Sequence, residues 1–175
     1  MRGRQASPKG VPVRYVMQPF EVKLSYNGKS WTTVPLEVGH NEIGDAEEPD
    51  MRVPKEVSNV FVSPGFSPLN PMPFMKLTHQ VAQKLRGLME DGSECAHDLV
   101  DLQVIMAEEP PSLEDIKPIC VGLFSCRGTQ SWPPRIEAQP GWSEGYASAS
   151  EGLPVLGFEE VVVWSNDLIE RIDSV

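Results

Sequence analysis

The stretch from His79 to Ile105 constrains the fold most, because it predicts two short helices that each carry a charged residue among apolar ones. On a helix that turns about 100° per residue, Lys84 lies about 20° from Leu77, within the apolar stripe of the first helix. Asp98 falls on the apolar side of the second helix by the same geometry. We therefore expect both charges to face inward. The two stripes consist of Leu77, Val81, Leu85, Leu88 and Met89, and of Cys95, Leu99, Leu102, Ile105 and Met106.

The segment between the helices, Glu90-Asp91-Gly92-Ser93, is typical of a turn. The helices are therefore expected to run antiparallel and to bring Lys84 and Asp98 towards one crevice. Buried charges cost several kcal/mol each unless they are paired, so one interpretation is a structural ion pair. The other is that Lys84 binds an anionic substrate such as a polyphosphate, while Asp98 orients that substrate or its metal ion. Spacing alone leaves both interpretations open.

Length and charge narrow the function classes. A chain of 175 residues is expected to form one domain. Its 15 basic and 25 acidic residues give a net charge of −10, which disfavours broad electrostatic binding to nucleic acid but allows a local contact through a few lysines. The basic start, Met1 to Arg4, is not followed by the apolar segment of a secretory signal, and no apolar run reaches the ~20 residues of a membrane span. We expect a cytoplasmic protein without membrane contact.

The three cysteines, Cys95, Cys120 and Cys126, are odd in number and lack CxxC spacing. This pattern favours neither a disulfide framework nor a zinc site. Their apolar neighbours predict that all three are small buried side chains.

Alternating residues between Val13 and Gly39 predict strands, and Asn27-Gly28 favours a tight hairpin between them. The second arm, Trp31–Val38, places Glu37 between two apolar neighbours. Glu37 is then either an ordinary outward strand residue or a metal-binding carboxylate at the centre of a strand.

The remaining elements predict an α+β fold with strands first and helices after. Residues 1–75 form the strand-rich part of this single domain and residues 76–175 the helical part. Within the first part we expect a solvated loop over 40–54, a short strand over 57–62 and an extended proline-rich connection over 64–73.

In the second part, Ser112 with Asp115 resembles a capping box that opens a helix through Phe124, with Pro118 inside it. Residues 130–150 are rich in Pro, Gly and Ser, with two tryptophans as expected anchors, and residues 158–172 predict a final amphipathic helix. The tryptophans are Trp132 and Trp142.

The paired helices resemble the nucleotidyltransferases of the AbiEii/AbiGii abortive-infection toxin class, known from phage defence and toxin–antitoxin systems. That class carries a helix of the form AEKLHAL, a short turn and a helix of the form RxxDLxDL. The chain has Ala82-Gln83-Lys84-Leu85-Arg86-Gly87-Leu88 and Asp98-Leu99-Val100-Asp101-Leu102. The segment after the paired helices also resembles the tail of proteins of that class. The similar residues are Phe124, Arg127-Gly128-Thr129, Trp132-Pro133-Pro134, Trp142 and Tyr146.

This resemblance implies a polymerase-beta-like fold and metal-dependent transfer of a nucleoside monophosphate from an NTP. In the class, the motif lysine contacts the nucleotide phosphates and the first aspartate of DLxDL completes the active site. Those roles fall to Lys84 and Asp98, while Asp101 is a supporting carboxylate. Glu37 corresponds to an acidic residue on a later strand and is the candidate Mg²⁺ ligand. The implied partners are the NTP, a tRNA or protein acceptor and a cognate antitoxin.

The chain lacks one element of the class, an upstream Gly-Ser turn followed by an acidic DxD that holds the catalytic metal ions. Gln83 also replaces the usual glutamate, and Cys95 the basic residue of RxxD. Because phosphoryl transfer depends on metal ions that neutralise developing charge, this absence suggests the C-terminal portion of such an enzyme. The alternative is an inactive remnant or half-protein that acts as a partner-binding module.

Overall fold

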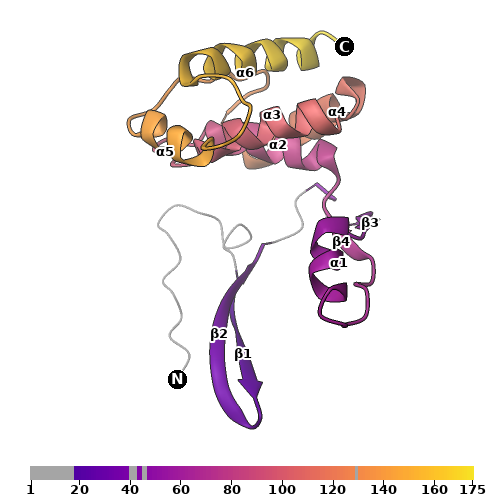
Figure 1. The fold of residues 1–175 in the computed structure, drawn as a ribbon. Coiled ribbons are helices and arrows are strands. Elements are labelled where there is room, and N and C mark those ends of the chain that lie inside the picture. Colours follow the sequence, from indigo (N-terminus) through magenta and orange to yellow (C-terminus); the bar gives the residue numbers. More distant parts are fainter. Residues whose placement is uncertain (1–17, 40–42, 45–46, 129) are drawn as a thin grey trace. The chain divides into compact units, whose positions relative to one another are not determined.

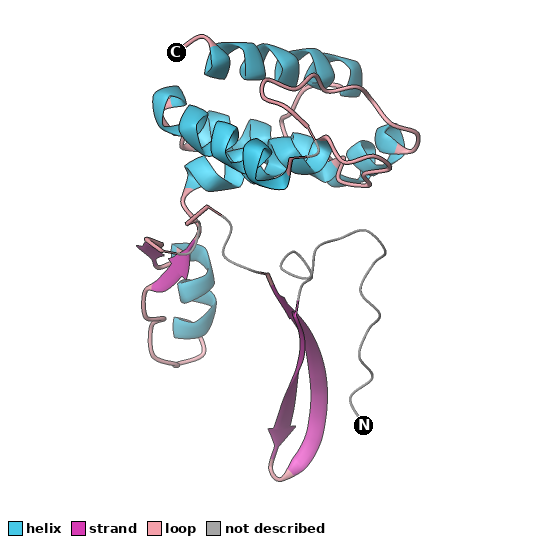
Figure 2. Ribbon diagram, turned by 180° about the vertical axis from the view of Figure 1, so that it is seen from behind, coloured by secondary structure: helices cyan, strands magenta, loops and turns pink. Residues whose placement is uncertain are grey.

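The computed structural model describes residues 18–39, 43–44, 47–128 and 130–175, and it has the expected α+β composition (Figures 1 and 2). The chain forms two compact units, Met1–Glu42 and Ile43–Val175. The strands are β1 (Gln18–Tyr26), β2 (Lys29–Val38), β3 (Asp50–Arg52) and β4 (Met72–Phe74). The helices are α1 (Lys55–Val62), α2 (Leu77–Leu88), α3 (His97–Glu108), α4 (Leu113–Arg127), α5 (Trp142–Ala149) and α6 (Phe158–Asp173).

The first unit contains the predicted hairpin. Strands β1 and β2 pair antiparallel, and the turn residues Asn27 and Gly28 have φ of 49° and 75°. Positive φ at both central residues defines the turn class that Asn-Gly favours, so the hairpin prediction is confirmed. Glu37 lies opposite Pro19 on the exposed β2 strand.

One face of the hairpin is apolar. Cross-strand partners share a face, and the register places Phe20 opposite Leu36 and Val22 opposite Val34. Glu21, on the other face, lies opposite Pro35. All the large apolar side chains of the two strands are exposed. A two-stranded hairpin is marginal by itself in water, and an apolar face of this kind is normally stabilised by a further packing layer.

The second unit begins with two elements that differ from the predictions. Residues 57–62 belong to helix α1 and not to a strand, and Asp50–Arg52 is a strand within the predicted loop. Val57, Val60 and Phe61 have the i, i+3, i+4 spacing of a helix, and a short apolar run does not distinguish helix from strand by itself. Strand β3 pairs antiparallel with β4, which lies in the proline-rich connection. Residues 40–42 and 45–46 of the predicted loop lie outside the described residues.

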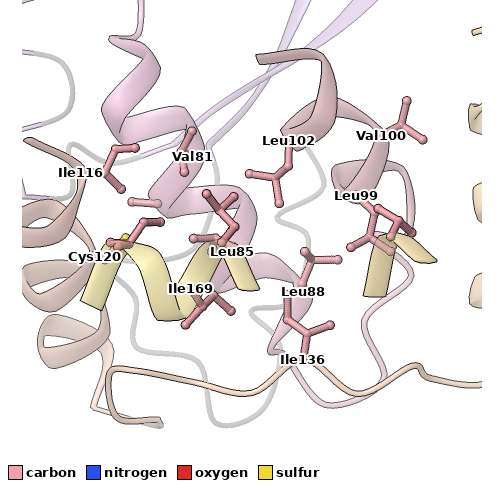
Figure 3. Packing of buried hydrophobic residues seen from close by; sticks show 14 of the residues in the cluster. Val81, Leu85, Leu88, Leu99, Val100, Leu102, Ile116, Cys120, Ile136 and Ile169 are labelled. Atoms are coloured by element: carbon pink, nitrogen blue, oxygen red, sulfur yellow. The ribbon is translucent and has the colours of Figure 1, made fainter. Parts of the chain in front are cut away.

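The hydrophobic core lies among the helices α2 to α6 (Figure 3). The predicted stripes supply its centre, because Val81, Leu85 and Leu88 of α2 are fully buried, as are Leu99 and Leu102 of α3. Further core residues come from α4, α6 and the segment between α4 and α5, including Ile116, Cys120, Leu123, Ile136, Leu168, Ile169 and Ile172. The remaining stripe residues, Leu77, Met89, Cys95, Ile105 and Met106, are half-buried.

Helices α4 and α6 follow the predictions closely, and α5 was not predicted. Ser112 is the N-cap of α4, but its side chain makes no capping hydrogen bond, so the capping-box prediction is wrong. Pro118 lies inside this helix. Helix α5 lies in the segment rich in Pro, Gly and Ser, and it begins at Trp142, which is a buried anchor as expected.

The prediction of three buried cysteines is wrong. Cys120 is buried, and burial raises the pKa of its thiol to about 12. Cys95 is half-buried because it precedes the first residue of α3, and Cys126 is exposed on the last turn of α4. None of these three described residues forms a disulfide. No helix in the described part of the chain is both long and apolar enough to cross a membrane.

Candidate functional site

Lys84 lies in a cluster with two carboxylates of the facing helix. Its ammonium Nζ donates hydrogen bonds to Asp98 Oδ1 at 2.9 Å and to Asp101 Oδ2 at 2.6 Å. The side chains of Lys84 and Asp98 are only 20% and 12% exposed, which confirms that both face inward. Asp101 is 48% exposed and contacts the lysine directly, a contact that the sequence analysis did not predict.

The antiparallel arrangement of α2 and α3 brings these groups together. Lys84 contacts Asp101, whereas Gly87, one turn later in α2, lies beside Asp98. A Cβ atom on Gly87 would lie 3.2 Å from Asp98 Oδ2, so the absence of a side chain there leaves room for the carboxylate. Asp98 is also in the first turn of α3, where the helix dipole favours a negative charge.

The cluster keeps Lys84 protonated. Burial lowers the pKa of Lys84, but hydrogen bonds to Asp101 and Asp98 raise it, and the pKa ends above its ordinary value. The stabilisation is therefore present below the ordinary pKa of a lysine and is lost as the pH rises through the higher folded-state value. Two of the three N–H donors of the ammonium point to carboxylates of the described chain, which leaves one donor for a ligand.

The described residues contain no group of three His, Cys, Asp or Glu side chains that could hold a metal ion. Asp98 and Asp101 converge on the Lys84 ammonium, which occupies the position that a cation would take between them. Glu37 belongs to the hairpin unit, where it lies on the exposed strand β2.

A cleft of about 700 Å³ lies in the second unit, where β3, β4 and α1 meet the start of α2. Arg52 closes one side by donating two hydrogen bonds to Glu109, from Nη1 to Oε2 at 2.6 Å and from Nη2 to Oε1 at 3.0 Å. Phe74, Leu77 and Gln80 line it as well. The sequence analysis missed this cleft, because Arg52 and Glu109 are 57 residues apart and no local pattern joins them.

A buried hydrogen-bond network ties the tail of the chain to α3. Gln103 Nε2 donates to the backbone oxygen of Leu99 and to Tyr146 Oη, and Tyr146 Oη donates to the backbone oxygen of Leu156. The Leu156 N–H completes the ring by donating to Gln103 Oε1 at 2.8 Å. Such a satisfied network stabilises one arrangement of the core. Tyr146 therefore has a structural role.

Arg86 is a second buried cation that the sequence analysis missed. Its guanidinium carbon lies 5.7 Å from the centre of the Phe124 ring, and Nη1 lies 3.6 Å from Glu90 Oε1. The Phe124 ring also meets Trp132 edge-on at 5.5 Å between ring centres. Phe124 thus packs between Arg86 and Trp132 and links α2 to α4 and the segment after it.

Comparisons with known proteins do not assign the chain to a family. No protein-family model matches the chain, and no curated protein matches it either.

Proposed function

We propose that the chain belongs to the metal-dependent nucleotidyltransferases of the AbiEii/AbiGii class, which transfer a nucleoside monophosphate from an NTP to an RNA or protein acceptor. The observation that carries the proposal is the Lys84 ammonium, held by Asp98 and Asp101 with one N–H donor left for a ligand. Both partners belong to the DLxDL segment of the motif. A protonated, partly exposed lysine at this position suits a phosphate oxygen.

In this proposal the three residues have different tasks. Lys84 donates a charge-assisted hydrogen bond to the triphosphate. Asp98, the more buried carboxylate, fixes the direction of the ammonium. Asp101, which is half exposed, is the partner that an incoming phosphate oxygen displaces at lowest cost.

The proposed reaction joins the acceptor oxygen to the α-phosphorus and releases pyrophosphate. As the acceptor hydroxyl attacks, its O–H bond breaks and the proton passes to solvent. The bond between the α-phosphorus and the oxygen that bridges to the β-phosphate breaks, and pyrophosphate leaves with the electron pair. The resemblance implies Mg²⁺ for this chemistry, and we assign its binding neither to Asp98 nor to Asp101, because both are engaged with Lys84.

Calorimetric titration with each NTP in the presence of Mg²⁺ tests the proposal. Lys84→Met is expected to weaken binding at least about tenfold, because a hydrogen bond from a charged group is worth roughly 1.5–3 kcal/mol. Lys117→Met is the matched control, because Lys117 is also a half-buried lysine but donates to the backbone oxygens of Asp173 and Val175. A folded Lys84→Met protein with unchanged NTP affinity would contradict the proposed role of Lys84.

The exposed apolar face of the hairpin favours a second candidate function, that of a partner-binding module. Phe20, Val22, Val34 and Leu36 form a continuous surface on one side of β1 and β2. The partner would be a cognate antitoxin or a polypeptide that carries the DxD element. Packing of such a partner on this face would add a second layer to the hairpin and stabilise it.

Co-expression with the products of adjacent reading frames, followed by co-purification, tests this second function. Val34→Lys is expected to abolish co-purification, because it places a charge in the centre of the apolar face. Glu21→Lys, on the opposite face, is the control and should leave co-purification unchanged. A chain that stays monomeric and transfers nucleotides without a partner would rule the second function out.

A further inference from the structure

We propose that the cleft beside α2 holds the nucleoside part of the NTP whose phosphates Lys84 binds. This inference rests on the proposed function and adds the place of the base and ribose. Three properties of the cleft support it: the chemistry of the lining residues, the place of the cleft along α2 and α3, and the summed charge of the lining side chains.

The lining suits a flat heterocycle with polar edges. The cleft of about 700 Å³ is within the range of ligand pockets, roughly 300–1,000 Å³. Phe74, Met75 and Leu77 supply apolar surface, and the residue Phe74 is still 36% exposed. An aromatic ring with a free face is a stacking partner for any base.

Gln80 adds a polar group that can contact the edge of a base. Its Nε2 donates to the backbone oxygen of Met75 at 2.7 Å, which fixes the orientation of the side-chain amide. Its Oε1 has no partner among the described residues and is left to accept a hydrogen bond from a ligand.

The cleft and the Lys84 cluster lie along the same face of the helix pair. In α2, Leu77 and Gln80 are within about 40° of Lys84 on the helical wheel, and Gln80 is about 6 Å from it along the axis. In α3, Glu109 at the C-cap lies about 20° from Asp98 by the same geometry. A ligand that extends from the cleft along this face of α2 therefore runs in the direction of Lys84.

The charges assign the two ends of the ligand. The charged side chains that line the cleft, Arg52, Lys55, Glu56 and Glu109, sum to zero, because two are positive and two negative. A neutral lining suits the uncharged nucleoside and offers little to a triphosphate. The Lys84 ammonium, with its remaining N–H donor, suits the anionic end. The base and ribose thus belong in the cleft and the phosphates at Lys84.

Two probes test this assignment, an NTP and inorganic tripolyphosphate, each titrated into the full chain with Mg²⁺. Phe74→Ala is expected to weaken NTP binding about tenfold through loss of stacking and to leave tripolyphosphate binding unchanged. Phe74→Leu keeps the apolar packing of β4 without the aromatic ring, so it should show the same selective loss if Phe74→Ala fails to fold. Phe66→Ala is the control, because Phe66 is an exposed aromatic residue outside the lining.

The outcomes separate this inference from the proposed function. If Lys84→Met weakens both probes while the folded Phe74 variants bind the NTP as the unmodified chain does, the nucleoside assignment is overturned and the phosphate role of Lys84 stands. If Lys84→Met weakens neither probe, the proposed function and the assignment both fail. Equal weakening of both probes by Phe74→Leu would also overturn the assignment, because the cleft would then act on the phosphates or on the fold.

Discussion

Replacing Trp142 with alanine is expected to lower the free energy of unfolding by about 3–5 kcal/mol, the usual cost of deleting a large buried aromatic side chain. Trp142 is almost completely buried at the start of α5. Its indole Nε1 donates to the backbone oxygen of Ser93 at 2.6 Å, in the turn between α2 and α3. The variant therefore leaves both a cavity in the core and an unsatisfied carbonyl in the turn that sets the position of the Lys84 cluster.

Urea denaturation followed by far-ultraviolet circular dichroism measures this loss. Trp31→Ala is the matched control, because Trp31 is 73% exposed on the hairpin and its removal should change the free energy by no more than about 0.5 kcal/mol. Trp142→Phe should lie between the two, since it keeps most of the packing and loses the hydrogen bond. Equal denaturation midpoints for Trp142→Ala and the unmodified chain would contradict the packing of α5 on the core.

The helices that carry the candidate site could be predicted because their burial follows a local period. Val81 and Leu85 in α2, and Leu99 and Leu102 in α3, repeat at three- and four-residue spacing and are all buried. The hairpin was predictable for a different local reason, the positive φ that Asn-Gly adopts with little strain. In both cases the structural cause lies within a few residues of its effect.

The features that were missed depend on contacts between distant segments. The helical wheel gives the direction of Lys84 but not the identity of its partners, so the contact with Asp101 was not predicted. The Arg52 to Glu109 ion pair joins residues that are separated in the chain by three helices, α1, α2 and α3. Helix α1 was missed because a short apolar run fits a strand and a helix equally well. The hydrophobic period thus predicted the helices that carry the site, but not the contacts that Lys84 and Arg52 make in it.

Asp98→Ala is expected to lower the free energy of unfolding by about 2–3 kcal/mol, because it leaves the Lys84 ammonium partly buried with one partner fewer. The loss stays below that of a fully buried pair, since Asp101 still accepts a hydrogen bond from Lys84 at 2.6 Å. Urea denaturation measures the loss, and Asp115→Ala is the control, because Asp115 is an exposed first-turn aspartate of α4.

The double variant Lys84→Met, Asp98→Leu separates structure from function. It removes both charges and keeps apolar volume, and buried ion pairs replaced in this way are often neutral or stabilising. We therefore expect the double variant to be more stable than Asp98→Ala and close in stability to the unmodified chain, yet to bind an NTP at least about tenfold more weakly, as Lys84→Met does. If the double variant is as unstable as Asp98→Ala, the fold requires the ion pair. That result would favour a structural role for Lys84 over a role in phosphate binding. If it is stable but inactive, the fold does not need this charged pair, and phosphate binding is the remaining reason to hold a lysine between two aspartates at the centre of the helix pair.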